Sequence, residues 1–276
     1  MDGRRDIHAL RQSLAALEPV GLIGPESRFS LGADGPDRAL GGGLMRGALH
    51  EVLGAAGADA ASAAGFVAGL SLRAGLRIDE DLRAEGGAMR LRKTLWVRQV
   101  AGEVETGKLY PQGLLDIGLL PQTLIQVRLK DAAAVLRAGI EGARCEALGA
   151  VVIEPWGNPK VLDLTATRRL TLAAEESGVP IFLLRLCARA EPSAATTRWQ
   201  VGALASRPLE ANAPGMPAFD ITLLRQRAGT AGLNWQMEWN RDEQRFEEQA
   251  ISRAVAPLSS DRPAGASGAQ GWRQAG

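Results

Sequence analysis

The sequence lacks an excess of charge of either sign, and it has few cysteines. Its 276 residues carry 32 Lys and Arg against 31 Asp and Glu, and the net charge of +1 excludes a global attraction to nucleic acid or to an anionic membrane. Contact with DNA is therefore expected to be indirect or weak. The two cysteines, Cys145 and Cys187, lie far apart and match no metal-ligand spacing, which indicates a reduced, cytoplasmic protein.

Long apolar runs and catalytic motifs are also missing. No stretch approaches the roughly 20 apolar residues that span a bilayer, and the first residues, MDGRRDIHALRQSL, lack the apolar run of a signal peptide. Only His8 and His50 could act as imidazole bases, and no G-x-S-x-G, H-E-x-x-H or paired-cysteine set occurs. We expect a soluble protein without membrane contact, in which His50 has a structural role.

What the sequence does contain is an alternation of strands and helices from residue 48 onward. Near-continuous apolar strands joined by helices indicate an α/β fold with a buried, mostly parallel sheet. Short strands within residues 196–204 and 219–240 predict a β-rich C-terminal part. The predicted strands of the main part are residues 48–54, 94–100, 123–129, 149–155 and 181–186, and the predicted helices are residues 60–72, 131–144 and 162–177.

The segments around this core set the expected domain organisation. Residues 1–28 comprise an amphipathic helix and a linker, residues 29–248 form the main domain, and residues 249–276 form a flexible tail rich in Ala, Ser, Gly and Pro. A polar stretch over residues 24–37 separates the helix from the first strand of the predicted sheet. Residues 77–93 carry mixed charges and a Gly-Gly pair, which predicts an exposed insertion whose Arg and Lys side chains form a solvated face.

A strand, a glycine-bearing turn and a helix of small residues succeed one another at residues 49–72, as in a phosphate-binding loop. That loop, G-x-x-x-x-G-K-[ST], needs a lysine for the β- and γ-phosphates and a hydroxyl for magnesium. Gly54 aligned with the first glycine places Asp59 at the second, Ala60 at the lysine and Ala61 at the hydroxyl. Each lost charge-assisted hydrogen bond costs about 1.5–3 kcal/mol. We therefore expect a degenerate P-loop that binds no nucleotide and packs against the sheet.

Two other positions bear on nucleotide hydrolysis. The strand TLWVRQV ends in Gln99 and Val100, where a nucleotide hydrolase of this layout keeps a carboxylate to orient water. The strand AVVIEP ends in Glu154, at the position of a magnesium-associated acid. Without lysine and hydroxyl partners, Glu154 is interpreted as a relic or a structural acid.

The residues ahead of the turn resemble the entry to the RecA core. The stretch FSLGADGPDRALGGGLMRGALHEVLG, residues 29–54, is similar to the pattern x-S-x-G…L-D-x-A-L-G-G-G-L-x-x-G-x-x-x-E-x-x-G that precedes the RecA phosphate loop. The similarity continues through TLWVRQV, LYPQGLLDIGLLPQTLIQV and AVVIEP. A RecA-like layout thus covers most of residues 29–190.

A closer resemblance is to the ImuA family. It rests on LDLTATRRLTLAAEESGVPIFLLR at residues 162–185 and SAATTRWQVGALASRP at residues 193–208, together with the later FDITLLRQRAG and WQMEWNRDEQRFE. The resemblance implies a non-catalytic adaptor without cofactor in SOS translesion synthesis and mutagenesis. Its implied partners are ImuB, an error-prone DnaE-type polymerase and, further, RecA. A SulA-like role in halting cell division stays open, whereas Ala60, Ala61 and Gln99 disfavour an active RecA-type ATPase.

Seven residues are the candidates for partner contact. Leu10, Leu14 and Leu17 form an apolar stripe on the N-terminal helix, which suits docking into a groove or packing on its own domain. Arg168 and Arg169 share one helix, and Arg198 stands beside Trp199; Arg and Trp are enriched at interface hot spots. The alternatives are a solvated helix face and a tryptophan that fills the core.

Overall fold

The computed structural model describes residues 27–78, 89–213 and 215–249. The predicted N-terminal helix with Leu10, Leu14 and Leu17, and the predicted tail from residue 250 onward, lie outside the described residues. The predictions made for these two segments therefore stay predictions.

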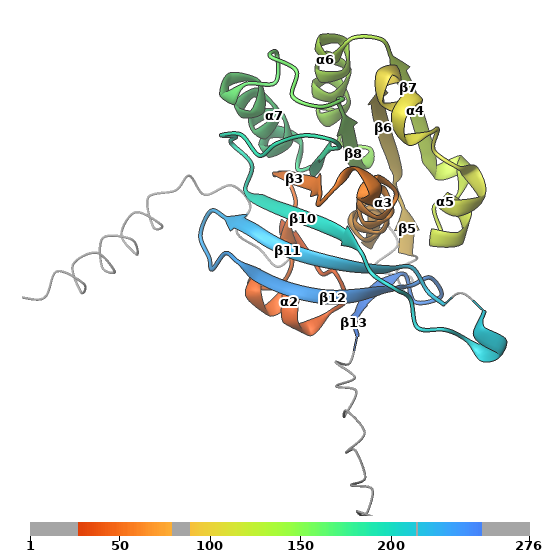
Figure 1. The fold of residues 1–276 in the computed structure, drawn as a ribbon. Helices are drawn as coiled ribbons and strands as arrows, with labels where there is room; N and C mark the ends of the chain where they lie inside the picture. The colour runs from red at the N-terminus through yellow and green to blue at the C-terminus, as the bar shows by residue number, and fades with distance from the viewer. Residues whose placement is uncertain (1–26, 79–88, 214, 250–276) are drawn as a thin grey trace, which may run out of the picture.

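A nine-stranded sheet crosses the described domain in the order β13-β12-β11-β10-β3-β9-β8-β6-β7 (Figure 1). The strands from β10 to β7 run parallel to their neighbours, whereas β11, β12 and β13 are added antiparallel. This arrangement confirms the mostly parallel sheet with a β-rich C-terminal part. Its strands are β3 Leu49–Gly54, β6 Lys93–Gln99, β7 Leu124–Leu129, β8 Leu148–Glu154, β9 Ile181–Arg185, β10 Thr197–Ala203, β11 Ala218–Gln226, β12 Leu233–Asn240 and β13 Arg245–Glu248.

Helices cover both faces of this sheet. The helix α3 (Ala60–Gly75) packs on one face, where α5 (Pro111–Ile117) lies beside it, and α6 (Ala132–Ala143) and α7 (Leu164–Ser177) pack on the other (Figure 1). Strand side chains alternate between the two faces: Trp96 joins the core under α3, whereas Leu95 and Val97 join the core under α6. The α/β layering is therefore set by the apolar runs of the strands.

The helix boundaries on the α6 and α7 face match the capping residues that the sequence offers. Asp131 and Asp163 each accept a hydrogen bond from a backbone amide of the first helical turn, on α6 and α7 respectively. Gly178 ends α7 in the left-handed conformation, with a φ of 71°. Asp163 and Gly178 therefore bound α7.

The polar stretch of residues 24–37 is more than the connection that was predicted. Within its described part, β1 (Arg28–Phe29) pairs with β2 (Leu44–Met45), and the short helix α2 (Asp34–Ala39) lies between them. Phe29 and Leu31 are buried in the core. Asp37 accepts hydrogen bonds from the Ser30 hydroxyl and from the Leu31 and Gly32 amides, which gives this turn a fixed shape.

The predicted insertion at residues 77–93 is in part structured. Its two ends pair as an antiparallel ladder of β4 (Leu76–Ile78) and β5 (Met89–Leu91), and Lys93 already belongs to β6. Arg92 donates a side-chain hydrogen bond to the Glu146 carbonyl, so it is not simply solvated. The residues between the two strands, Arg83 among them, lie outside the described ranges.

Short helices fill the segment between β6 and β7, where the pattern predicted none. They are α4 (Val100–Thr106), α5 and the 3₁₀ turn η4 (Pro121–Thr123). Pro111 starts α5 and Gly118 ends it in the left-handed conformation. Another 3₁₀ turn, η5 (Glu210–Asn212), lies between β10 and β11.

Candidate functional site

The turn between β3 and α3 lies at the carboxyl ends of the parallel strands. Gly54 ends β3, the 3₁₀ turn η2 (Gly57–Asp59) comes next, and Ala60 and Ala61 begin α3. The amide of Ala55 donates to the Val201 carbonyl on β10 at 2.8 Å. The first turn of α3 therefore offers methyl groups at the positions where a phosphate loop carries its lysine and hydroxyl.

The carboxylate of Asp59 holds this turn together. Its Oδ2 accepts from the Ala56 amide at 2.8 Å, and its Oδ1 accepts from the Ala203 amide on β10 at 2.8 Å. The Asp59 amide in turn donates to the Ala56 carbonyl at 3.1 Å. A phosphate at this turn would have to displace the protein's own carboxylate from the Ala56 amide and would meet its negative charge.

Glu154, at the end of β8, forms a buried pair with Arg98 on β6. Arg98 Nη2 donates to Glu154 Oε1 at 2.8 Å, and Trp96 Nε1 donates to Oε2 at 2.8 Å. Burial raises the pKa of Glu154, and the Arg98 charge and these two hydrogen bonds oppose that rise. Both carboxylate oxygens are therefore engaged by β6, which makes Glu154 a structural acid here.

Gln99 joins three segments at the same edge of the sheet. Its side-chain carbonyl accepts from the Trp156 amide at 3.0 Å, and its Nε2 donates to the Lys130 carbonyl at 3.2 Å. An amide at this position donates and accepts at once but has no proton affinity for activating water. Its contacts are those of a residue that positions loops.

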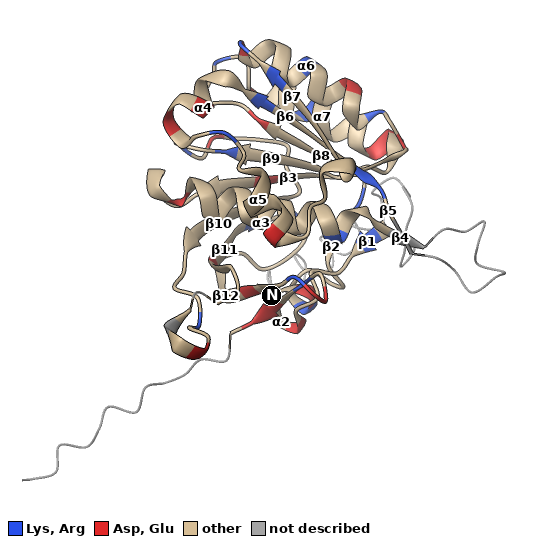
Figure 2. Ribbon diagram, turned by 90° about the vertical axis from the view of Figure 1, so that its right-hand side faces the viewer, with Lys and Arg blue, Asp and Glu red and all other residues tan. Residues whose placement is uncertain are grey.

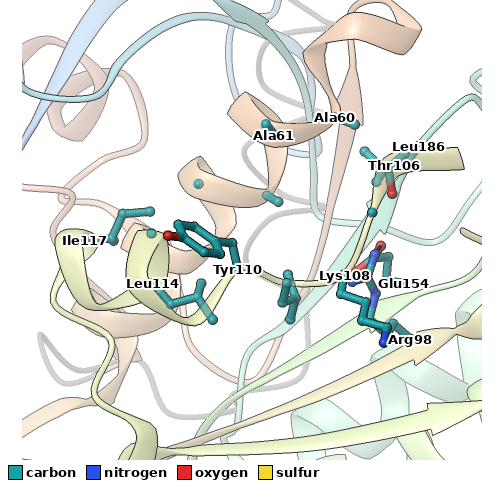
Figure 3. A pocket seen from close by; sticks show the side chains of 15 residues that line it. Ala60, Ala61, Arg98, Thr106, Lys108, Tyr110, Leu114, Ile117, Glu154 and Leu186 are labelled. Atoms are coloured by element: carbon teal, nitrogen blue, oxygen red, sulfur yellow. Dashed lines mark hydrogen bonds and ion pairs between the residues drawn. The ribbon is translucent and has the colours of Figure 1, made fainter. Parts of the chain in front are cut away.

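A cavity of about 370 Å³ opens beside these residues, between α3 and α5 (Figure 3). The first turns of α3 form one wall, through Ala60, Ala61 and Ala64, and α5 contributes Leu114 and Ile117. Arg98 and Glu154 lie at one end, with Lys108 and Tyr110 also lining the space (Figure 3). Nothing in the sequence pattern indicated this cavity, because α4 and α5 were not predicted.

A second buried carboxylate, Glu51 on β3, holds another cluster. Glu51 Oε1 accepts from Arg185 Nη1 at 3.1 Å, and Oε2 accepts from Arg198 Nε at 2.6 Å and from the Ser193 hydroxyl at 3.0 Å. Burial lowers the pKa of Arg185, and the Glu51 charge opposes that shift, as does the Glu191 charge to a smaller extent. Arg198, predicted at an interface, thus lies within this cluster with 13% of its side chain exposed.

His50 and Trp199 belong to one buried network between β3 and β10. Trp199 Nε1 donates to the Thr197 hydroxyl at 2.9 Å, this hydroxyl lies 2.8 Å from His50 Nδ1, and His50 Nε2 lies 2.8 Å from the Met45 carbonyl. Burial lowers the pKa of His50 to about 4, with the Met45 hydrogen bond opposing. The expected structural role of His50 is confirmed. Trp199 is 0% exposed and fills the core, which corrects its use as an interface anchor.

The remaining predicted contact residues lie elsewhere. Arg168 and Arg169 are exposed on α7, which packs on β3 and β9 from the face opposite α3. The segment that leads into β10 contacts α7, since the Ala194 amide donates to the Thr167 hydroxyl. Figure 2 shows Lys and Arg mixed with Asp and Glu along the ribbon, in keeping with the near-zero net charge.

Within residues 27–78, 89–213 and 215–249, no group of three or more His, Cys, Asp or Glu side chains is placed to hold a metal ion. In the same ranges, no helix has the length and apolar character needed to cross a membrane. Cys145 and Cys187 are both free and exposed.

Comparison with known proteins places the chain in a family. No protein-family model matches it. It is 32% identical over 203 residues to the Protein ImuA of two strains of Caulobacter vibrioides, NA1000 / CB15N and ATCC 19089 / CIP 103742 / CB 15, covering 70% of this chain and 75% of each relative. Among solved structures, the RadB recombinase matches with a TM-score of 0.51 at 17% identity, over 80% of this chain and 100% of that one. The chain therefore belongs to the ImuA family and has a RecA-like fold.

Proposed function

We propose that this chain is a non-catalytic accessory protein of SOS mutagenesis, which keeps the RecA-like sheet as a scaffold for protein contacts. Family membership and fold support a role in that system. The observation that carries the non-catalytic part is the Asp59 carboxylate seated on the Ala56 amide, ahead of Ala60 and Ala61. A phosphate would find neither a lysine nor a hydroxyl at this helix start.

The surroundings of Glu154 support the same proposal. Both oxygens of Glu154 already accept hydrogen bonds from β6, which leaves fewer lone pairs for a magnesium ion or its waters. The Arg98 guanidinium supplies the positive charge that a metal ion would bring. Gln99, bound to Trp156 and Lys130, does not replace the missing general base.

The partners that we propose come from the family resemblance: ImuB, an error-prone DnaE-type polymerase and RecA, in the cytoplasm. The experiment is co-purification of the tagged full chain from DNA-damaged cells. We expect ImuB or RecA to be captured, and capture to persist without ATP. Capture of the tubulin-like division ring protein in their place would replace this function with the SulA-like one. Turnover of ATP by the purified chain would overturn the non-catalytic part.

A further inference from the structure

The cavity between α3 and α5 combines apolar walls with a charged end, and the proposed function assigns it no role. Two of its walls are aliphatic, formed by Ala60, Ala61 and Ala64 of α3 and by Leu114 and Ile117 of α5. Pockets that bind ligands typically begin at about 300 Å³, and this cavity measures about 370 Å³. The short alanine side chains at the start of α3 leave this space open, since longer side chains there would extend into it.

The polar end of the cavity is formed by a guanidinium with unused donors. The Arg98 side chain is 3% exposed, and its Nη2 donates a hydrogen bond to Glu154. Its Nε and Nη1 have no hydrogen-bond partner among the described residues. A buried donor without an acceptor costs about 1–3 kcal/mol. Glu154 accepts from Arg98 through Nη2 and makes no hydrogen bond with the other two nitrogens of this guanidinium. Because Arg98 lines the cavity, a carboxylate entering it would bring an acceptor next to this guanidinium.

The charge around the cavity also favours an acidic group. Lys108 lines the cavity and is exposed, and no ion pair joins it to another described residue. The Arg98 and Glu154 charges cancel, so Lys108 leaves this end with one positive charge. Glu103 on α4 is near enough for the Lys108 charge to lower its pKa, but its ion pair is with Arg128.

Apolar side chains continue beyond the cavity on the same segment of chain. Tyr110, which lines the cavity, is 70% exposed, and Val104 on α4 is 81% exposed. A small metabolite would be covered by the cavity alone, whereas a peptide extends over its rim. Exposed aromatic and aliphatic residues beside a pocket are typical of protein contact sites.

We propose that this cavity binds a peptide segment of a protein partner, in which a Leu- or Phe-sized side chain stands next to an Asp or Glu. The apolar side chain enters between α3 and α5, and the carboxylate accepts from Arg98 with Lys108 beside it. The inference rests on the proposed function only in taking the ligand to be a protein, and it does not depend on which protein supplies the segment.

The test uses the full chain and fluorescein-labelled peptides Gly-Ser-X-Z-Gly-Ser, in which X is Asp or Glu and Z is Leu, Ile, Phe or Met. We expect saturable anisotropy changes for at least one peptide, and roughly tenfold weaker binding when X becomes Asn or Gln. Ala61→Leu, at an exposed position, fills the cavity and should abolish binding, whereas Ala231→Leu, at an exposed turn far from it in sequence, should not. Lys108→Ala should weaken binding roughly threefold.

Several outcomes would overturn this proposal. They are the absence of saturable binding by every peptide, equal binding by Ala61→Leu, equal binding of acidic and amide peptides, and displacement of the peptide by ATP with magnesium. Melting curves of Ala61→Leu and Ala231→Leu establish that both are folded. Failure here leaves capture of ImuB or RecA by the wild-type chain unaffected, so the two proposals fail separately.

Discussion

Two buried carboxylates lie on parallel strands of the sheet, and they differ in how fully they are enclosed. Glu51 receives donors from Arg185 on β9, Arg198 on β10 and Ser193 in the connecting loop. Glu154 receives donors only from Trp96 and Arg98, both on the neighbouring strand β6, among the described residues. The Glu51 cluster links three strands and a loop, whereas the Glu154 pair borders a cavity.

The difference separates a structural cluster from a candidate binding site. In the Glu51 cluster, Arg185 uses both terminal nitrogens, on Glu51 and on the Gly157 carbonyl, and leaves only Nε without a described partner. In the Glu154 pair, Arg98 uses one terminal nitrogen and leaves two nitrogens without a described partner. The Glu51 cluster therefore serves the fold, whereas the Glu154 pair borders the cavity and its arginine keeps two nitrogens without a described partner.

The largest expected effect comes from breaking the Glu51 cluster. Glu51→Ala leaves the buried Arg185 and Arg198 charges uncompensated, and we expect the free energy of unfolding to fall by about 3–5 kcal/mol. Urea unfolding followed by circular dichroism measures it. Glu191→Ala is the control: Glu191 is 48% exposed and lies 3.8 Å from Arg185, so its loss should cost less than about 1 kcal/mol. Equal costs for the two variants would contradict a closed cluster.

The pH dependence of stability tests His50, a buried titratable side chain whose hydrogen-bond partners, the Thr197 hydroxyl and the Met45 carbonyl, are uncharged. Its pKa in the folded protein is lowered to about 4 from 6.5, so the unfolded chain binds more protons between these values. The stability that neutral His50 provides is complete above pH 6.5 and is lost as the pH falls toward 4, by about 3 kcal/mol. His50→Gln should flatten this part of the pH profile. An unchanged slope in the variant would assign the loss to other groups.

Breaking the Glu154–Arg98 pair should destabilise the protein less than breaking the Glu51 cluster. Burial raises the pKa of Glu154, so its negative charge at neutral pH is held against a desolvation penalty that its removal relieves. Glu154→Ala leaves one buried arginine unpaired, where Glu51→Ala leaves two, and we expect it to lower the free energy of unfolding by about 1–3 kcal/mol. The same urea series measures it. A cost above that of Glu51→Ala would reverse the comparison.

Removing the Asp59 carboxylate should lower the free energy of unfolding by less still. Asp59→Ala removes the acceptor of the Ala56 and Ala203 amides, and a loss of about 1 kcal/mol is expected, as for a helix-capping residue. Asp59→Asn keeps an acceptor oxygen and should lose about half of this. Neither variant should gain affinity for nucleotide, because Ala60 and Ala61 remain. An Asp59→Ala variant as stable as the wild type would show that the carboxylate does not hold the turn.

The smallest effect is expected on α7. Arg168→Ala and Arg169→Ala change exposed side chains, and the free energy of unfolding should stay within about 0.5 kcal/mol of the wild type. Their use is in the capture experiment, where a fall in ImuB or RecA recovery with unchanged stability would support α7 as a contact surface. Unchanged capture by both variants would remove Arg168 and Arg169 from the candidate interface.

The order of strands and helices could be read from the sequence because the strands are continuous apolar runs and the helices carry clear caps. The same pattern failed between β6 and β7, where α4 and α5 are too short for a helical period to be recognised. It also misplaced Arg198 and Trp199, since β10 alternates buried and half-buried residues and a single chain does not tell which side faces the core.

The sequence predicted which phosphate-binding residues the site lacks, but not which residues contact one another there. The absence of the lysine and of the hydroxyl can be read directly from the sequence. The hydrogen bond between the Ala203 amide and Asp59 could not be predicted, because it joins segments far apart in the chain. One usable signal was overlooked: Arg98 is a charged residue within an apolar strand, and Glu154 ends another. Buried charges require partners, and that rule could have paired them.

The most direct test of the central claim, that this RecA-like turn is closed to phosphate by its own carboxylate, is a thermal melt with and without millimolar ATP and magnesium. A ligand that binds only the folded state raises the melting temperature. We predict identical melting temperatures for the wild-type chain under both conditions. A reproducible rise with ATP and magnesium, absent with magnesium alone, would contradict the claim.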